Sequence, residues 1–313
     1  MDVLLAGDFD AGEREDWLQA LGAAMPEARW HARDDPGFDP GRVTAAVVAN
    51  PPPGSLRALP RLALIQSLWA GVDRLLADPT LPEGVPIARM VDPAMNRAMA
   101  ETALWAVIAL QRDFFVYGRQ QQQGLWRQHA QRRPDDWPVL VLGMGEMGRT
   151  AARALVAAGY PVSGWSRNPG VADAGVERLS GDVELWRALP LARVLVNLLP
   201  LTAQTQGLLG ARLFDALPRG AALVNLARGR HVVDDELLAA LDDGRLSHAV
   251  LDVFHQEPLP PAHPYWRHER VTLLPHVAAQ TDARSAAAVA VTNLRALRDG
   301  LPLQHRVDRG RGY

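Results

Sequence analysis

The strongest constraint on the fold is a glycine motif, G-x-G-x-x-G, at residues 143–148. An apolar run at residues 139–142 precedes it directly, and a stretch of helical composition at 149–158 follows it. In such a strand-turn-helix setting, the first glycine permits a tight turn, the second lets a pyrophosphate approach the backbone, and the third lets helix and strand pack closely. The helix N-terminus adds free N–H groups. The motif predicts a dinucleotide site formed by Gly143, Met144, Gly145, Glu146, Met147 and Gly148.

Short apolar runs alternate with helix-like stretches along the chain. The first part predicts a helix at residues 13–24 and strands at 3–6, 45–49, 62–67 and 86–90. The second part predicts strands at 139–142, 161–165, 194–199, 221–226, 249–254 and 271–274. Residues 97–123 lack proline and predict one or two long helices, and residues 282–298 predict a last helix. This alternation is typical of α/β folds with doubly wound parallel sheets.

The chain is long enough for two domains, with 313 residues of which 48% are hydrophobic. We therefore predict two Rossmann-like or flavodoxin-like α/β domains, each with a doubly wound parallel sheet, and an interdomain cleft. Residues 1–100 plus 282–313 form the predicted substrate-binding (catalytic) domain. Residues 101–281 form the predicted dinucleotide-binding Rossmann domain.

Composition excludes several classes of function. A formal net charge of -2 gives no broad basic surface for nucleic acid or anionic lipid. The chain contains no cysteine, so disulfides, thiolate metal sites and thiol nucleophiles are excluded. The histidines show no metal-ligand spacing, and no metal is predicted. The sequence shows no signal peptide and no membrane span, which predicts a cytoplasmic protein.

The end of the second strand of the dinucleotide unit reads Trp165-Ser166-Arg167-Asn168. NAD-specific folds place an acidic residue here that accepts hydrogen bonds from the ribose hydroxyls. With no carboxylate to repel it, a 2′-phosphate is expected to bind the Ser166 hydroxyl and the Arg167 guanidinium. The pattern favours NADP(H), with NAD(H) used less efficiently. The alternative is that Arg167 is an ordinary solvated arginine and that both cofactors are accepted.

Three ionisable residues follow successive strands and are expected at the same edge of the sheet. Arg228 follows the strand that ends near Asn225, Glu257 lies in the loop after the next strand, and His276 follows the last one. In open α/β sheets, ligands bind at the carboxyl ends of the strands. Arg228 is therefore placed to meet an anionic substrate. Taken singly, each residue is more often a structural hydrogen-bonding group than a catalyst.

Together these patterns resemble the D-isomer-specific 2-hydroxyacid dehydrogenase family, and within it the NADPH-using glyoxylate/hydroxypyruvate reductase branch. The resemblance covers nearly the whole chain. Its matching segments are L-W-A-G-V-D at 68–73, the glycine motif, W-S-R at 165–167, N-L-L-P-L-T at 197–202, A-R-G at 227–229, D-V-F at 252–254 with Glu257-Pro258, and P-H-V-A at 275–278.

The resemblance implies a catalytic role for each ionisable residue. His276 would be the general acid in reduction, since its pKa lies near working pH. Glu257 would hydrogen-bond the imidazole, fix its orientation and raise its pKa. Arg228 would bind the substrate carboxylate or carbonyl and stabilise charge developing on oxygen. Further cofactor contacts are expected from Ser166, Arg167, Asn168, Leu199, Pro200, Leu201, Thr205, Ala227, Arg228, Asp252, His276 and Ala278.

The family's substrate loop corresponds to Trp69, Ala70, Gly71 and Val72, whose N–H groups would meet the substrate carboxylate beside Arg228 and His276. Trp69 would wall a small pocket, although it is alternatively a core or surface aromatic. Residues 197–202 would run under the nicotinamide, although their apolar side chains are alternatively core alone.

The predicted reaction is reduction of glyoxylate, hydroxypyruvate or a similarly small 2-keto acid by NADPH, and hydroxypyruvate would give the D product. A second class stays open, in which the chain is a dinucleotide-sensing protein that acts through protein partners. The resemblance also implies a homodimer formed through helices such as residues 98–120. The sequence does not rank one keto acid above another, because pocket size depends on side chains from both domains.

Overall fold

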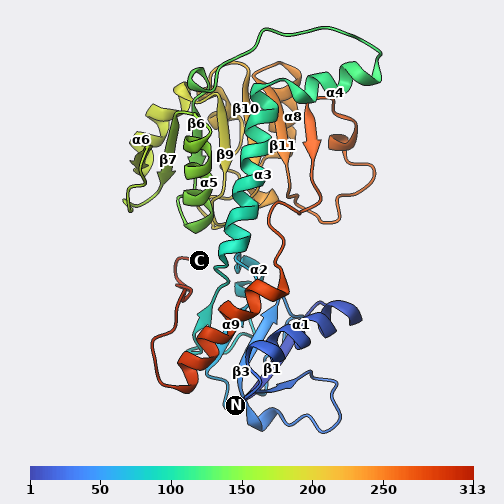
Figure 1. The fold of residues 1–313 in the computed structure, drawn as a ribbon, viewed down its shortest axis with the longest axis vertical. Coiled ribbons are helices and arrows are strands. Elements are labelled where there is room, and N and C mark those ends of the chain that lie inside the picture. The colour runs from blue at the N-terminus through green and yellow to red at the C-terminus, as the bar shows by residue number, and fades with distance from the viewer. The chain divides into compact units, whose positions relative to one another are not determined.

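The computed structural model describes all 313 residues and divides them into two compact units, each built on its own parallel sheet (Figure 1). Unit 1 comprises Met1–Met95 and Thr281–Tyr313, and unit 2 comprises Asn96–Gln280. The division falls within the long helix α3 (Pro93–Gln111). No helix has the length and apolar character needed to cross a membrane.

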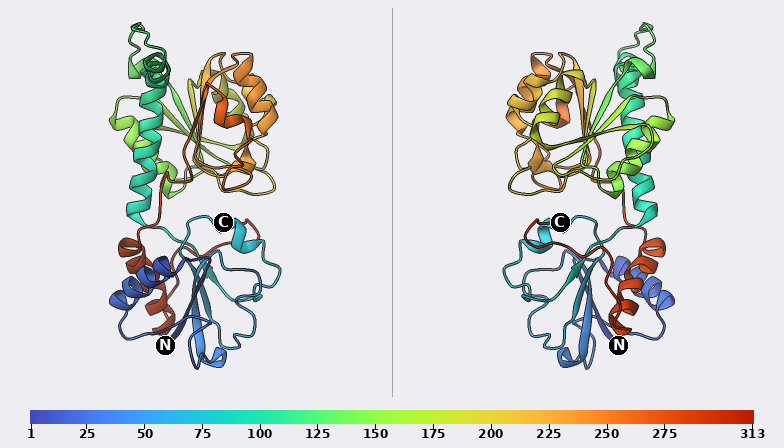
Figure 2. Two further views of the ribbon diagram at one scale, coloured as in Figure 1. Left: turned by 90° about the vertical axis from the view of Figure 1, so that its right-hand side faces the viewer. Right: turned by 90° about the vertical axis from the view of Figure 1, so that its left-hand side faces the viewer.

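Unit 1 has five parallel strands in the order β2-β1-β3-β4-β5. Helices α1 and α9 lie on one face of this sheet and pack against each other, while turns and the short α2 cover the other face (Figure 2). The C-terminal segment runs antiparallel beside β5, where the N–H of Val307 donates to the carbonyl of Ile87 at 2.8 Å. The elements are β1 (Asp2–Gly7), α1 (Ala11–Ala24), β2 (Arg29–His31), β3 (Val43–Ala49), β4 (Leu64–Ser67), α2 (Asp73–Leu76), β5 (Ile87–Ala88) and α9 (Ala283–Arg298).

Unit 2 has seven parallel strands in the order β12-β11-β10-β9-β6-β7-β8. The order reverses between β6 and β9, which is the point where open α/β sheets bind their ligands. The strands are β6 (Val139–Leu142), β7 (Val162–Ser166), β8 (Val176–Ser180), β9 (Val194–Asn197), β10 (Ala221–Asn225), β11 (Leu246–Leu251) and β12 (Val271–Leu273). Besides α3, the helices are α4 (Phe114–Gln122), α5 (Glu146–Ala157), α6 (Gly181–Ala188), α7 (Ala211–Ala216) and α8 (Asp234–Asp242).

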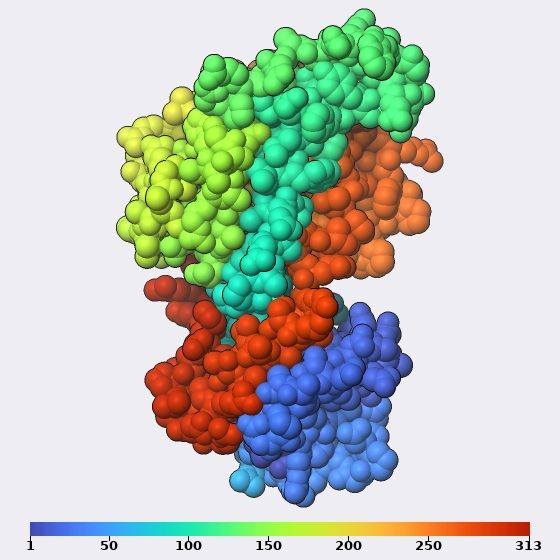
Figure 3. All heavy atoms as spheres, viewed as in Figure 1, coloured from blue at the N-terminus to red at the C-terminus, as the bar shows by residue number.

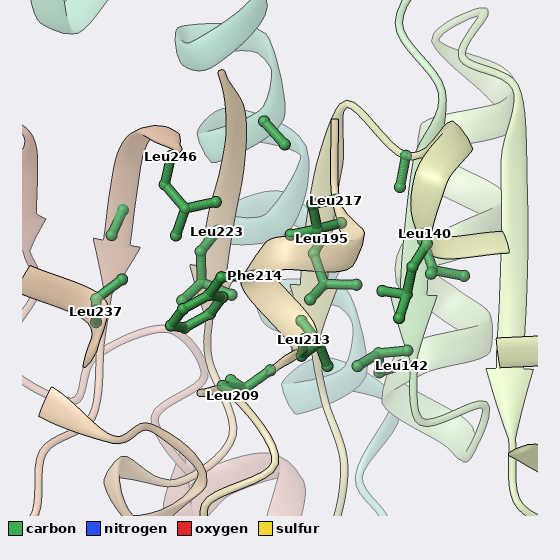
Figure 4. Packing of buried hydrophobic residues seen from close by; sticks show 14 of the residues in the cluster. Leu140, Leu142, Leu195, Leu209, Leu213, Phe214, Leu217, Leu223, Leu237 and Leu246 are labelled. Carbon is green, nitrogen blue, oxygen red and sulfur yellow. The ribbon is translucent and has the colours of Figure 1, made fainter. Parts of the chain in front are cut away.

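The central strands β6, β9 and β10 are buried on both faces, which explains why they are apolar up to the asparagines that end β9 and β10. Successive side chains point to opposite faces. Val139 and Val141 of β6 pack under α3 and α5, whereas Leu140 and Leu142 pack with α6, α7 and α8. Figure 4 shows the second of these layers, with Phe214 of α7 set among leucines. Truncating such a fully buried phenylalanine to alanine costs about 3–5 kcal/mol.

The observed elements match most of the predicted ones, and the doubly wound α/β architecture is confirmed. Two strands were missed, β2 and β8, because both are edge strands that carry several polar side chains. The strand predicted at 249–254 runs instead over Leu246–Leu251, so Asp252 begins the loop. The predicted helical stretch 97–123 is two helices, separated near Asp113, whose φ of 57° is left-handed.

Candidate active site

The glycine motif forms the turn between β6 and α5. Gly143 has a φ of +98°, and a Cβ there would lie 2.5 Å from the carbonyl oxygen of Leu198. A Cβ on Gly148 would collide with the carbonyl of Gly143. Around Gly145, in contrast, a Cβ would meet nothing within 4 Å. No side chain caps the N-terminus of α5. Open space and free N–H groups thus meet at the second glycine, which fits a pyrophosphate.

The carboxyl end of β7 brings Ser166, Arg167 and Asn168 together. The Ser166 hydroxyl donates to the carbonyl of Asn168 at 2.7 Å, and Arg167 is exposed. Arg178 of β8, which the sequence did not predict as part of this site, donates to the Ser166 hydroxyl oxygen. Arg178 is far from Ser166 along the chain, so no local sequence pattern links the two residues. Only the pairing of β8 with β7 makes them neighbours.

Arg228 lies just beyond β10 and is half-buried. Its Nη1 donates to the carbonyl of Ala227 at 2.7 Å. The next residue must be glycine, because a Cβ on Gly229 would overlap the backbone of Phe254. This close approach fixes the Arg228 segment against the loop that carries Glu257. The structure therefore holds the segment of Arg228 next to the loop of Glu257.

Glu257 and His276 are in direct contact. Oε2 of Glu257 lies 2.7 Å from Nδ1 of His276, and its Oε1 accepts from the N–H of Phe254 at 2.9 Å. The hydrogen bond to Glu257 raises the pKa of His276, against an opposing effect of burial. Burial also raises the pKa of Glu257, but its bonds to His276 and Phe254 outweigh burial and hold that pKa below its usual value. The positive charge of Arg228 acts to lower both pKa values.

His276 has a backbone φ of 55°, in the left-handed region that a residue other than glycine rarely adopts. Asp252 holds this conformation through three hydrogen bonds. Its carbonyl accepts from the N–H of His276 at 2.9 Å, and its carboxylate oxygens accept from Val277 at 2.7 Å and from Ala278 at 3.1 Å. Asp252 is 1% exposed, and burial raises the pKa of its carboxyl group. Both carboxylate oxygens are thus used to shape the His276 loop.

A buried polar network, also missed from the sequence, lies beneath Arg228. Nδ2 of Asn197 donates to Oδ1 of Asn225 at 2.9 Å and contacts Nδ1 of His231 at 3.0 Å. Nδ2 of Asn225 donates to the carbonyl of Arg228 at 3.0 Å. Nε2 of His231 lies 3.3 Å from the carbonyl of Pro200. The signal in the sequence was an asparagine at the end of two adjacent strands, where buried amides need partners.

The remaining predicted cofactor residues lie in the turn after β9 and at buried positions after β10 and β12. The Thr205 hydroxyl donates to the carbonyl of Pro200 at 2.8 Å, which closes the turn that carries Leu199 and Leu201. Ala227 and Ala278 are buried. Ala227 directly precedes Arg228, and Ala278 follows two residues after His276.

The predicted substrate loop belongs to unit 1 and joins β4 to α2. The N–H of Trp69 donates to the Ser67 hydroxyl at 3.0 Å, and its carbonyl accepts from Met90 at 3.1 Å. Trp69, Ala70 and Gly71 are half-exposed. The N–H groups of Ala70 and Gly71 donate to no acceptor in the protein, so they are available to an anion.

Known proteins of one family match this chain in sequence and in fold. A family model described as "D-isomer specific 2-hydroxyacid dehydrogenase, NAD binding domain" matches residues 104–278. The glyoxylate/hydroxypyruvate reductase A of Serratia proteamaculans is 41% identical over 307 residues, which cover 96% of each chain.

Two solved structures share the whole architecture. A D-isomer specific 2-hydroxyacid dehydrogenase from Xanthobacter autotrophicus, in complex with NADPH and MES, has a TM-score of 0.94 and 39% identity over 100% of this chain and 99% of its own. The NADPH-dependent glyoxylate/hydroxypyruvate reductase of Sinorhizobium meliloti, in complex with NADP and sulfate, has a TM-score of 0.93 and 34% identity over the same shares. This chain belongs to the D-isomer specific 2-hydroxyacid dehydrogenase family.

Proposed function

We propose that this chain is an NADP(H)-dependent reductase of small 2-keto acids, with glyoxylate and hydroxypyruvate as its best substrates. The observation that carries the proposal is the 2.7 Å contact between His276 and Glu257, next to Arg228 at the carboxyl edge of a dinucleotide-binding sheet. Two relatives at about 40% identity over nearly the full chain both bear the name glyoxylate/hydroxypyruvate reductase A.

The residues around the glycine motif fit an NADP(H) cofactor. The open space at Gly145 and the uncapped start of α5 suit the pyrophosphate. Ser166 and Arg167 lie where the adenosine ribose of a dinucleotide is expected, and no carboxylate follows β7 to repel a 2′-phosphate. The turn at Leu199, Pro200, Leu201 and Thr205, with Ala227, Asp252 and Ala278, would support the nicotinamide half. When bound, the cofactor supplies the hydride.

The protein's own part in the reaction is to bind the substrate and to deliver a proton. Arg228 pairs with the substrate carboxylate or carbonyl, and the free N–H groups of Ala70 and Gly71 are proposed to take up the carboxylate, with Trp69 and Val72 beside them. Glu257 holds Nδ1 of His276, which leaves Nε2 as the proton donor to the carbonyl oxygen. Hydride added to carbon and a proton added to oxygen yield the 2-hydroxy acid and the oxidised cofactor.

Steady-state oxidation of NADPH and of NADH, each with glyoxylate and with hydroxypyruvate, tests this function. We expect turnover in which kcat/KM with NADPH clearly exceeds that with NADH. The other candidate is a dinucleotide sensor that acts through protein partners. Tight NADPH binding without turnover of any small 2-keto acid would favour the sensor and contradict the reductase.

We also propose that the chain forms a homodimer through α3, α4 and the segment after α4. Large hydrophobic side chains are exposed there, namely Trp105 (42%), Phe114 (49%), Leu125 (44%) and Trp126 (93%). These elements lie on the surface of unit 2 in the space-filling view (Figure 3). Light scattering coupled to size exclusion should give twice the chain mass of 34.1 kDa, and a monomer at micromolar concentration would contradict the proposal. The cytoplasm remains the predicted location.

A further inference from the structure

Arg178 lies beside the end of β7 although it is twelve residues from Ser166 along the chain. In the parallel pairing of β7 with β8, Arg178 is opposite Gly164, and Ser166 is opposite Ser180. Because side chains alternate along a strand, Arg178 and Ser166 point to the same face of the sheet. Nη1 of Arg178 lies 3.3 Å from the carbonyl of Gly164, and its Nη2 donates to the Ser166 hydroxyl oxygen.

The charge of Arg178 is not balanced by a carboxylate. The acidic group that acts on it through space is Asp173, whose oxygens are bonded to Arg149 at 2.9 and 3.1 Å and to Arg153 at 3.2 Å. Nε of Arg178 is buried without a hydrogen-bond partner, and burial lowers the pKa of its guanidinium. A half-buried cation with unused donors is costly unless an anion completes its surroundings. The uncompensated charge of Arg178 thus favours an anion next to Ser166.

We propose that Arg178 binds the 2′-phosphate of NADP(H) together with Ser166, and that it sets the preference for this cofactor over NAD(H). The inference rests on the proposed function and assigns its cofactor preference to Arg178. Arg178 is held on β8 by its contacts with the Gly164 carbonyl and the Ser166 hydroxyl. Its planar group is therefore already positioned to meet a phosphate beside Ser166.

The test measures binding of adenosine 2′,5′-bisphosphate and of ADP by isothermal calorimetry, so that neither nicotinamide nor turnover enters the result. In Arg178→Gln we expect affinity for the 2′,5′-bisphosphate to fall about 10- to 100-fold, as for loss of a charge-assisted contact. Affinity for ADP, which lacks the 2′-phosphate, should change less than about twofold, well below the effect of one charge-assisted bond.

Arg153→Gln is the matched control, since this arginine is also close to Asp173 but lies on the exposed side of α5. It should leave both affinities unchanged. Should Arg178→Gln fail to fold by thermal melting, Arg178→Lys keeps the charge, and it should bind the 2′,5′-bisphosphate several-fold more weakly because an ammonium lacks the planar fork.

Two results would overturn the inference. Unchanged affinity for the 2′,5′-bisphosphate in the folded variant would show that Arg178 does not reach the phosphate. An equal loss of affinity for both nucleotides would show a purely structural role. If the wild type still reduces 2-keto acids with a preference for NADPH, either result rejects Arg178 alone and leaves the proposed function standing.

Discussion

Two histidines lie in loops at the same edge of the unit 2 sheet, and their surroundings are opposite. The side chain of His276, after β12, is 52% exposed and contacts the Glu257 carboxylate. His231, after β10, is fully buried and contacts the amide of Asn197 and the carbonyl of Pro200. A carboxylate partner stabilises the protonated ring, whereas an amide donor and a carbonyl acceptor fit one neutral tautomer. One loop is thus suited to give a proton, and the other to hold neighbouring loops in place.

The largest expected effect is that of His276→Ala. Loss of the proposed proton donor should lower kcat about 10²- to 10⁴-fold. Affinity for NADPH, measured by fluorescence titration, should stay close to that of the wild type, because the proposed phosphate contacts lie after β6 and β7. If His276→Ala kept full turnover, His276 would not be the proton donor, and the two histidines would not differ in this role.

Asp252→Asn should have the next largest effect. An amide nitrogen cannot accept from the N–H of Ala278, so the left-handed His276 would lose part of its support. A displaced catalytic group lowers kcat by about 100-fold or somewhat less. The exposed Asp235→Asn serves as the control. An Asp252→Asn enzyme with normal kcat would show that the His276 loop holds its shape without this carboxylate.

His231→Leu should act mainly on stability. The change removes the contacts of His231 with the Asn197 amide and the Pro200 carbonyl, which keep their bonds to Asn225 and Thr205, at a cost of about 1–3 kcal/mol in the free energy of unfolding. Urea denaturation measures this cost. The pH dependence of the remaining activity should match that of the wild type, since His231 donates no proton to substrate. A shifted pH profile would contradict the positioning role.

Much of this molecule was predictable from local sequence. The glycine motif, the apolar strands and the order of Arg228, Glu257 and His276 all follow from short-range patterns. The unpredicted parts depend on pairing in space. Arg178 becomes relevant only when β8 pairs with β7, and Asp252 proves to be a loop anchor only when its carboxylate meets residues 25 and 26 positions away.

Edge strands and buried amides explain the other misses. β2 and β8 carry polar side chains because one edge of each strand has no neighbouring strand, and they therefore lack the continuous apolar run of a central strand. Asn225 and His231 were not expected to interact, because their shared network forms only after β9 and β10 pair.

The central claim is that Glu257 keeps His276 protonated for reduction, and the pH dependence of kcat/KM in the wild type and in Glu257→Gln tests it most directly. The active form carries the proton, so activity should fall as pH rises through the pKa of His276, which the bond to Glu257 raises above its ordinary value. Glu257→Gln removes that cause, and the alkaline limb should move to lower pH. An alkaline limb at the same pH in both enzymes would contradict the account.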